Sequence, residues 1–505
     1  MTPVSYRHSE TVQAQVERGV ALGSGPTVLI GDRWEDGATE SEITSVNPAT
    51  GQILARARAA SAEQAARAAR RARAALDAGW AATRPEERSR LLHRLVDAVD
   101  AQRGDLEALI VTELGSPVST ARTMQVASAT ARLRYFADLA IKGPSGGWER
   151  HVPVDDGRYR NAGVLFWQPA GVVAAITAYN FPLGIAALKV GAALAAGCTV
   201  VLSPSPRTFL ATTALVRIAE RVGLPPGVLN LVTGNIESST ELTLSPDVDV
   251  VTFTGSSAVG AKIQAQAAST IKRVVLELGG KSPSILLPGA PLEAAIRSTV
   301  LRFSRNAGQA CGATTRILVP QPDYDAAAAL CEKIVAELPV GDPWDERTFV
   351  GPLIRGEQRD SVEAVVHRAV ENGAEIVAGG GRPPIQDGYY LNPAVLGSVS
   401  NTDEISRREL FGPVAVLIPY ADPDEALRIA NDTEYGLNAG VWGPLPEAIA
   451  FGRRIRSGTV ALNGGGPSRP DVPWGGFGRS GIGRDGGEEG LREFLEVQHV
   501  HWPLG

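Results

Sequence analysis

The sequence predicts an α/β fold with a mostly parallel, doubly wound sheet, a second α/β unit and a β-hairpin arm. From Gly171 onward, short apolar strands alternate with amphipathic helices, a rhythm typical of a parallel sheet covered by helices. A second alternating set begins near residue 282. A polar segment at 148–163 alternates as exposed strands do, which indicates the hairpin arm. At roughly 150 residues per domain, a chain of 505 residues holds two to four domains.

The segment before the first sheet is expected to be mainly helical. An Ala-rich run at 62–79 has helical spacing, and Ser61 and Gln64 occupy the two polar positions of a capping box. Gly79 then stops the helix. We expect further helix over 85–114.

The strands and helices that follow can be placed one by one. Between 171 and 280 we expect five strands and three helices, and from 282 onward five strands and one helix before a Gly-rich tail. The expected strands are 171–178, 198–204, 228–234, 249–255, 273–280, 282–290, 314–320, 374–380, 415–420 and 459–464, and the expected helices are 183–196, 208–222, 257–268, 324–338 and, near the end, 486–495.

Composition excludes several classes of protein. The chain has 49 basic and 55 acidic residues, a net charge of −6, and no clustered basic patch, which argues against a nucleic-acid protein. No stretch of about 18 apolar residues or signal-like leader is present, so no membrane partner is expected. Three cysteines without CxxC or metal-ligand spacing predict a reducing, cytoplasmic location and no metal. The first 26 residues allow either a helix or a loose tail.

One cysteine differs from the other two in its surroundings. Cys311 lies in FSRNAGQACGATTR, between an expected helix and the strand at 314–320, and its neighbours Gly308, Gln309 and Gly312 favour a turn over packing. Cys198 and Cys331 lie among apolar residues and are interpreted as small buried hydrophobes.

From about residue 28 to the end, the chain resembles the aldehyde dehydrogenase superfamily. Eight motifs occur in order with family-like spacing, and 34 residues separate Glu277 from Cys311, as in that family. The motifs are AYNFP (178–182), KVGAALAAGCTVV (189–201), GLPPGVLNLVTG (223–234), FTGSSAVG (253–260), LELGGKSP (276–283), NAGQAC (306–311), ELFGPV (409–414) and PWGGFGRSGIGRDGG (473–487).

The resemblance implies oxidation of an aldehyde to a carboxylic acid through a cysteine thiohemiacetal and a thioester. Cys311 would be the nucleophile, the side-chain amide of Asn180 and the Cys311 N–H would stabilise the oxyanion, and Glu277 would activate water. Read without the resemblance, Asn180 is a helix N-cap and Glu277 an exposed strand-end carboxylate. The alternatives for the whole protein are a coenzyme A-acylating aldehyde dehydrogenase, a non-redox thiol esterase and an idle nucleotide-binding protein.

The resemblance also implies a nicotinamide cofactor. Gly255 and Ser256 would present backbone N–H groups to its pyrophosphate at a helix start. The acidic residue that normally holds the adenine ribose is Pro206 here, and its loss, with Arg207 alongside, allows NADP as well as NAD. The full set expected to bind the cofactor is Ala178, Ser203, Ser205, Arg207, Gly255, Ser256, Leu278, Glu409 and Phe411.

The substrate pocket is expected to contain Tyr179, Phe181, Arg305 and Trp474. The glycine-rich loop at 463–471 suggests a roomy entrance that fits a bulky aromatic or terpenoid aldehyde. Arg305 matches an arginine with which semialdehyde dehydrogenases hold a substrate carboxylate, but the second arginine of that pair is Leu188 here.

The implied architecture has three parts. A Rossmann-like NAD(P)-binding domain takes residues 1–150 and 171–279, a catalytic domain takes 280–485, and an oligomerisation arm with the C-terminal tail takes 151–170 and 486–505. Because an exposed arm leaves an unprotected strand edge, we expect a homodimer or homotetramer.

Overall fold

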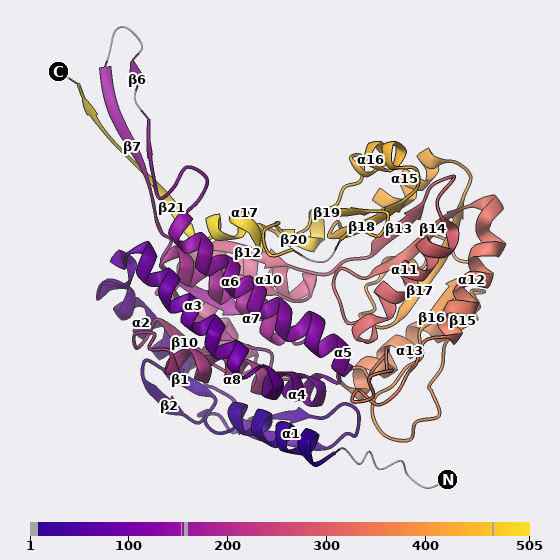
Figure 1. Ribbon diagram of the computed structural model, residues 1–505, viewed down its shortest axis with the longest axis horizontal. Coiled ribbons are helices and arrows are strands. Elements are labelled where there is room, and N and C mark those ends of the chain that lie inside the picture. The colour runs from indigo at the N-terminus through magenta and orange to yellow at the C-terminus, as the bar shows by residue number, and fades with distance from the viewer. Residues whose placement is uncertain (1–8, 153, 156–159, 467–468, 505) are drawn as a thin grey trace.

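The first sheet has eight strands, and its parallel centre was expected from the sequence. The computed structural model describes residues 9–152, 154–155, 160–466 and 469–504 (Figure 1). Its first sheet has the order β2-β1-β10-β9-β8-β11-β12-β20. The five central strands β10, β9, β8, β11 and β12 are parallel to one another, whereas β1 pairs antiparallel with β10, β2 with β1, and β20 with β12. The strands are β1 (Val28–Ile30), β2 (Arg33–Glu35), β8 (Val172–Ile176), β9 (Thr199–Ser203), β10 (Leu229–Val232), β11 (Val250–Thr254), β12 (Arg273–Glu277) and β20 (Gly481–Ile482).

The second sheet has seven strands in the order β15-β16-β17-β14-β13-β18-β19. All pairs are parallel except β15 with β16, which confirms the second α/β unit. The strands are β13 (Ser282–Leu286), β14 (Thr314–Pro320), β15 (Glu375–Gly379), β16 (Ala394–Gly397), β17 (Val414–Tyr420), β18 (Asn438–Trp442) and β19 (Thr459–Leu462). A separate ribbon joins β3 (Glu42–Val46) to β4 (Ile53–Arg58).

Helices cover both sheets, and separate hydrophobic cores lie against them. None of the described helices is long and apolar enough to cross a membrane. The helices are α1 (Glu10–Gly23), α2 (Ala62–Asp77), α3 (Pro85–Ala101), α4 (Arg103–Leu114), α5 (Val118–Thr120), α6 (Ala127–Lys142), α7 (Pro182–Ala196), α8 (Phe209–Arg221), α9 (Ile236–Leu244), α10 (Ser257–Ala267), α11 (Leu292–Ser304), α12 (Tyr324–Ala336), α13 (Gly356–Glu371), α14 (Glu404–Arg407), α15 (Pro423–Asn431), α16 (Leu445–Gly452) and α17 (Gly487–Arg492).

Among the N-terminal helices, the start of α2 was predicted correctly but the break between α3 and α4 was not. The capping box of α2 is confirmed, because Ser61 Oγ accepts from Gln64 N at 3.2 Å while Gln64 Oε1 accepts from Ser61 N at 3.0 Å. The helix expected over 85–114 is instead two helices that meet at Gln102, whose φ of −102° and ψ of 13° leave the helical region. The undecided N-terminal segment contains α1, which packs on α4 and α8.

The arm projects from the body of the molecule and includes the end of the chain (Figure 1). Its long strand β7 (Arg160–Pro169) pairs on one edge with β5 (Glu149–His151) and β6 (Val154–Asp155). On its other edge it pairs with β21 (Leu495–Pro503), from Leu495 opposite Pro169 to Pro503 opposite Asn161. Residues 153 and 156–159 of the expected hairpin lie outside the described part of the chain.

The short strand β20 joins the first sheet from near the end of the chain. It pairs with β12, and Leu276 lies opposite Ile482. A two-residue strand has no sequence signature of its own, and its position is fixed by the open edge of β12 that it covers.

Candidate active site

The three expected catalytic residues come from different elements that meet between the two sheets. Glu277 is the last residue of β12, Asn180 precedes α7 in the connection from β8, and Cys311 lies between α11 and β14. The backbone after Glu277 touches the cysteine loop, since a Cβ on Gly280 would lie only 2.9 Å from the Cys311 carbonyl oxygen. The carboxyl ends of β8 and β12 therefore face the cysteine loop, the edge where α/β sheets bind ligands.

A left-handed turn presents Cys311. Asn306, Ala307 and Gly308 have φ values of 53°, 53° and 72°, and the first two are rare for residues with side chains. A Cβ on Gly308 would lie 2.1 Å from the carbonyl carbon of Gly412, so only glycine fits there. Asn306 Nδ2 secures the turn by donating to the carbonyl oxygens of Asn180 at 3.2 Å and Gln309 at 3.2 Å.

Asn180 is buried and is tied to this same turn. Its Nδ2 donates to the Gln309 carbonyl at 3.1 Å, two residues before Cys311, and its own carbonyl accepts from Gln125 Nε2 at 3.0 Å. The reading of Asn180 as a helix N-cap is wrong, because α7 begins at Pro182 and Phe181 is its N-cap residue.

Glu277 is only 3 % exposed, so its reading as an exposed strand-end carboxylate is also wrong. Burial and the nearby Asp485 raise the pKa of Glu277 well above its usual range, while Lys189, the Trp474 side chain and Arg484 act in the opposite direction. Within the described part of the chain, its Oε1 has no hydrogen-bond partner. An oxygen left open in this way can bind a water molecule.

A buried ion pair lies beside Glu277 and was not identified from the sequence. Lys189 of α7 is fully buried, and its Nζ is 2.9 Å from Asp485 Oδ2 and donates to Thr252 Oγ1 at 2.8 Å. Two of the quoted motifs contain Lys189 and Asp485, and a buried lysine requires a nearby anion, which was the available signal.

The Cys311 thiol is half-buried, and its surroundings raise its pKa. Burial is the main cause that raises its pKa, followed by the carboxyl groups of Glu277 and Glu409, and the N–H groups of Gly312 and Cys311 oppose the shift. Cys198 and Cys331 are fully buried, as expected for cysteines that only pack.

Glu409 and Phe411 lie on the segment between α14 and β17, and the Glu409 carboxyl is close to Cys311. Glu409 Oε1 accepts from Gly280 N at 3.1 Å, and Oε2 fills the space of a side chain on Gly279, 2.0 Å from a Cβ there. Burial raises the pKa of Glu409 to about 7. Phe411 has a φ of 56° and packs edge-on against Tyr179, with ring centroids 5.9 Å apart.

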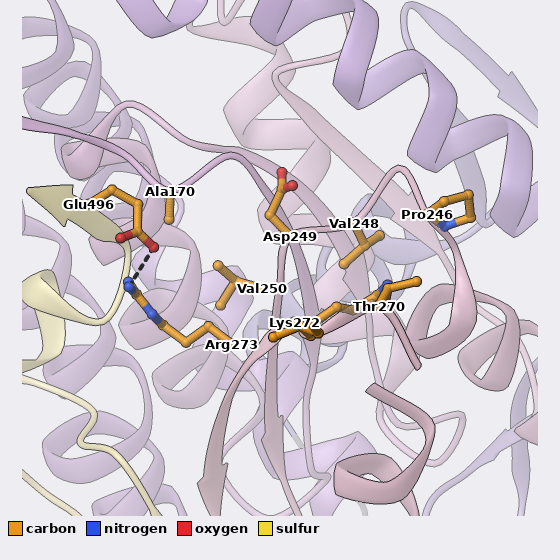
Figure 2. A pocket seen from close by; sticks show the side chains of 10 residues that line it. Ala170, Pro246, Val248, Asp249, Val250, Thr270, Lys272, Arg273 and Glu496 are labelled. Atoms are coloured by element: carbon orange, nitrogen blue, oxygen red, sulfur yellow. Dashed lines mark hydrogen bonds and ion pairs between the residues drawn. The ribbon is translucent and has the colours of Figure 1, made fainter. Parts of the chain in front are cut away.

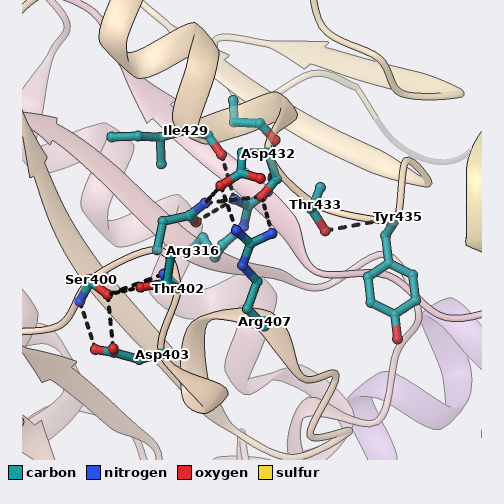
Figure 3. A network of polar contacts seen from close by, with 11 residues as sticks. Arg316, Ser400, Thr402, Asp403, Arg407, Ile429, Asp432, Thr433 and Tyr435 are labelled. Carbon is teal, nitrogen blue, oxygen red and sulfur yellow. Dashed lines mark hydrogen bonds and ion pairs between the residues drawn. The ribbon is translucent and has the colours of Figure 1, made fainter.

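A polar network holds the segment that carries Glu409. The fully buried Arg316 of β14 donates to the carbonyl oxygens of Lys281 at 2.8 Å and Ala430 at 2.9 Å. Arg407, two residues before Glu409, donates to Asp432 Oδ2 at 2.5 Å (Figure 3). The network connects the residue after Gly280 to the chain before Glu409.

The start of α10 offers free backbone N–H groups. Gly255 N donates to the Glu277 carbonyl at 3.0 Å and is not free, but the N–H groups of Ser256 and Ser257 have no acceptor among the described residues. On the adjacent helix α9, Ile236 is 85 % exposed, and Val259 of α10 is 44 % exposed. An anion-binding helix start beside exposed apolar side chains fits the pyrophosphate and adenine of a dinucleotide.

The other residues expected to bind the cofactor are less open. Ser203 is buried with its Oγ 3.2 Å from Ser239 Oγ, and Leu278 is buried against α10. Ala178 is half-buried, and Ser205 Oγ accepts from Arg207 N at 3.4 Å. Arg207 lies over the Tyr179 ring, 5.7 Å from its centroid, which places Tyr179 beside Arg207 and Phe411.

Of the remaining residues expected in the substrate pocket, Trp474 lies next to the cysteine loop. Trp474 lies against Gly312, where a Cβ would be 2.7 Å from the indole, and Phe181 is half-buried at the start of α7. Arg305 Nη1 is 3.1 Å from the Met124 sulfur, and its guanidinium lies 5.5 Å from the centroid of Phe349.

The glycine-rich loop near the expected entrance is anchored at its start. Arg302 Nη2 donates to the Gly464 carbonyl at 2.5 Å, and Gly464 and Gly465 have φ values of 91° and 61°. Residues 467–468 lie outside the described part of the chain.

A depression of about 470 Å³ lies away from this site, at the amino ends of β8, β11 and β12. Figure 2 shows Arg273 and Glu496 pointing toward each other at one end of it, and the ion pair measures 2.5 Å. Because parallel sheets bind ligands at the opposite, carboxyl edge, we assign it no part in the chemistry.

Comparisons with known proteins give matches over most of the chain. A sequence profile of the Aldehyde dehydrogenase family matches residues 34–500. A 3-succinoylsemialdehyde-pyridine dehydrogenase of a Pseudomonas species is 39% identical over 92% of this chain and 95% of its own length, and the mitochondrial succinate-semialdehyde dehydrogenase of Arabidopsis thaliana is 38% identical over 94% and 88%. The crystal structure of a Pseudomonas syringae aldehyde dehydrogenase variant with NAD+ and octanal has a TM-score of 0.89 and 39% identity, covering 94% of this chain and 96% of that one.

Proposed function

This chain belongs to the aldehyde dehydrogenase family, and from that premise we propose that it oxidises an aldehyde to a carboxylic acid with Cys311 as nucleophile and Glu277 as base. The observation that carries the proposal is the junction of the two sheets, where the left-handed turn before Cys311 is bonded to Asn180 and lies against the chain after Glu277. A nicotinamide dinucleotide, when bound, supplies the hydride acceptor.

Asn180 can stabilise the oxyanion without leaving its present partner. A side-chain amide has two N–H donors, and one of them is bonded to the Gln309 carbonyl at 3.1 Å. The second donor and the Cys311 N–H are then available to the oxygen of a thiohemiacetal, which forms when the Cys311 sulfur attacks the aldehyde carbon. Because Gln309 and Asn306 fix its position, Asn180 needs no reorganisation when the charge develops.

Glu277 would act when the thioester is hydrolysed. Its open Oε1 can accept a proton from water, and its raised pKa makes it a stronger base than an exposed glutamate. Hydrolysis by water releases a free acid. The unbonded Oε1 of Glu277 therefore favours the proposal over coenzyme A acylation, and membership of the family disfavours a thiol esterase.

Cysteine activation would depend on the charge of the cofactor. Burial and two nearby carboxyl groups favour the neutral thiol, so a positive charge near the sulfur is required to favour the thiolate. A bound oxidised nicotinamide, held by Glu409 and Phe411, would supply that charge.

We infer that the site accepts both NAD and NADP. The free N–H groups of α10 would hold the pyrophosphate, Glu409 and Phe411 would position the nicotinamide ribose, and Arg207, next to Pro206, would supply a positive charge for a 2′-phosphate. Pro206 provides no carboxylate to repel that phosphate. A ratio of kcat/KM for NAD over NADP above about 1000 would contradict this inference.

For the architecture we propose the expected division of the chain into domains, with β20 assigned to the first domain. We also propose that subunits pair through the arm. The long β7–β21 ribbon supports it, because Val500 and Trp502 on β21 are 42 % and 44 % exposed. The cytoplasmic location remains a prediction from the cysteine count.

The reaction is tested by absorbance at 340 nm with NAD or NADP and a panel of aliphatic, aromatic, terpenoid and carboxylate-bearing aldehydes. We expect an aldehyde-dependent rise that disappears in Cys311→Ala. Turnover of an ester without cofactor, and no rise with any aldehyde, would overturn the proposal.

A further inference from the structure

Gln125 is a polar side chain at the start of a buried, apolar stripe of helix. It belongs to a π-helical turn, Ala121–Val126, that runs directly into α6. Gln125 is fully buried, and Ala129 and Leu133, which follow it at intervals of four residues, are buried as well. This stripe packs against α7, since a Cβ on Gly191 of α7 would lie 3.4 Å from Leu133. A buried amide in a π-helical turn, a feature frequent at functional sites, indicates a role beyond packing.

Only one side of the Gln125 amide is bonded. Its Nε2 donates to the Asn180 carbonyl at 3.0 Å, whereas its Oε1 is equally buried and has no hydrogen-bond partner among the residues that the structure describes. Turning the amide over would place Oε1 against the Asn180 carbonyl oxygen, and two acceptors repel each other. A buried acceptor without a donor lowers stability. An apolar side chain of the same length would therefore leave the fold no less stable.

The bond from Nε2 reaches the residue that carries the proposed oxyanion donor. Asn180 precedes α7, whose first backbone hydrogen bond runs from Ile185 N to the Phe181 carbonyl at 2.8 Å and so begins one residue later. The helix ladder therefore does not hold the Asn180 carbonyl. The orientation of this residue depends on side-chain hydrogen bonds instead.

Gln125 holds Asn180 from outside the left-handed turn before Cys311. The other two hydrogen bonds of Asn180 both join it to that turn: Asn306 Nδ2 donates to its carbonyl at 3.2 Å, and its own Nδ2 donates to the Gln309 carbonyl at 3.1 Å. Within the described chain, Gln125 is the one hydrogen-bond partner of Asn180 that lies elsewhere. Without it, these bonds would fix Asn180 to the turn alone.

We propose that Gln125 is a positioning residue that orients Asn180 toward the charged oxygen of the thiohemiacetal, and that it performs this role at a cost in stability. This inference rests on the proposed function and adds a residue to it. A donor stabilises an oxyanion only at the point where the charge develops. A displacement of Asn180 by about 1 Å therefore slows the steps that lead through the thiohemiacetal to hydride transfer.

The test replaces Gln125 with methionine, which has about the same length and no strong hydrogen-bonding group. With NAD and the aldehyde of the panel that the wild type oxidises fastest, kcat/KM should fall by about 10- to 100-fold in Gln125→Met. The midpoint of urea unfolding should equal that of the wild type or exceed it, because an unpaired acceptor is removed and the Asn180 carbonyl keeps Asn306 as its donor. Binding of NADH, measured by its fluorescence, should not change.

Gln64→Met is a matched control at a second buried glutamine, whose amide is bonded on both sides. Gln64 Nε2 donates to Glu35 Oε1 and to the Asp36 carbonyl, both at 2.9 Å. Its Oε1 accepts from Ala38 N at 2.8 Å and from Ser61 N at 3.0 Å. Replacing Gln64 should lower the urea midpoint and leave kcat/KM unchanged, the opposite of the result expected for Gln125→Met.

Gln125→Leu repeats the test with a different apolar shape, so that the fit of methionine does not decide the result. If neither variant of Gln125 keeps the wild-type urea midpoint, or if neither folds, Gln125 is a structural residue and the inference is overturned. A variant that keeps both the midpoint and kcat/KM would overturn it as well.

The outcomes distinguish this inference from the proposed function. If the wild type oxidises no aldehyde of the panel, the proposed function fails, and the inference fails with it. If the wild type is active and the variants of Gln125 are as active and as stable as the wild type, the function stands and Gln125 does not position Asn180.

Discussion

At the scale of single residues, Glu277 combines burial with an unbonded oxygen. Replacing it with Gln keeps the shape of the side chain and removes the proton acceptor. We expect Glu277→Gln to release one equivalent of NADH rapidly and then to stall, because the thioester forms but is not hydrolysed. Stopped-flow absorbance at 340 nm measures the burst.

Cys311→Ala is the comparison variant for this experiment. It should show neither burst nor turnover while it still binds the cofactor. A steady-state rate near that of the wild type in either variant would contradict the assigned roles.

The Lys189–Asp485 pair gives a prediction about pH. Glu277 acts as a base when deprotonated, so kcat rises as the pH rises through its pKa. The positive charge of Lys189 lowers that pKa, and its removal in Lys189→Met should therefore raise it and move the acid limb of the kcat profile to higher pH, by about one unit. The exposed Lys262 of α10 supplies the control, Lys262→Met. A limb that stays in place would show that Lys189 does not act on Glu277.

At the scale of elements, the left-handed turn before Cys311 is the most constrained segment of the site. Gly308→Ala adds a methyl group at a φ of 72°, 2.1 Å from the Gly412 carbonyl carbon. Gly373→Ala is a matched control, with a φ of 97° and no atom within 4 Å of the added carbon. Both variants should lose about 1 kcal/mol or more of stability from backbone strain.

Only Gly308→Ala should also lose most of its activity, because the collision displaces the cysteine loop. Thermal melting and kcat measured side by side check this. Equal activity in the two variants would mean that the turn tolerates the collision.

A buried carboxyl group holds the start of α8. Glu113 accepts from the N–H groups of Leu210 and Ala211, both at 2.9 Å, and burial raises its pKa to about 7. The unfolded chain releases this proton near pH 4.5, so the stability that the protonated group contributes is lost as the pH rises through about 7.

Comparison with Glu113→Gln isolates this contribution. Relative to the variant, the wild type should lose about 3 kcal/mol of unfolding free energy between pH 4.5 and pH 8. Urea unfolding at both pH values, with the exposed substitution Glu63→Gln as control, measures the difference. A difference that does not change with pH would contradict the raised pKa.

What the sequence predicted depends on the range of the interactions. The capping box of α2 and most of the parallel strands are encoded by residues close together in the chain and were expected, whereas the parallel strands β16 and β18 were not. The tail strand β21 forms on the edge of β7, and the two-residue strand β20 forms on the edge of β12, which lies over 200 residues earlier in the chain.

The site shows the same division. Cys311 and Glu277 lie in motifs that can be identified from the sequence alone. The bond of Asn180 to Gln309 depends on how two loops far apart in the chain meet, which no local pattern encodes.

At the scale of the whole molecule, the arm should control assembly. Val500 and Trp502 are exposed on the same side of β21, and an exposed apolar strand favours association. The double substitution Val500→Lys with Trp502→Lys should reduce the mass of the particle measured by light scattering. Ile376→Lys, on the edge strand β15, introduces the same charge elsewhere and should not. An unchanged mass in the arm variant would exclude the arm as the contact.

Because Glu277 lies on one sheet and Cys311 beside the other, the activity of the enzyme depends on how the two halves are positioned relative to each other. Each half has its own hydrophobic core and can keep its helices intact while the halves shift slightly against each other. Such a shift changes the distance from base to sulfur before it changes anything inside either core. The turnover rate is therefore more sensitive to the relative position of the two halves than a spectroscopic measurement of helix content.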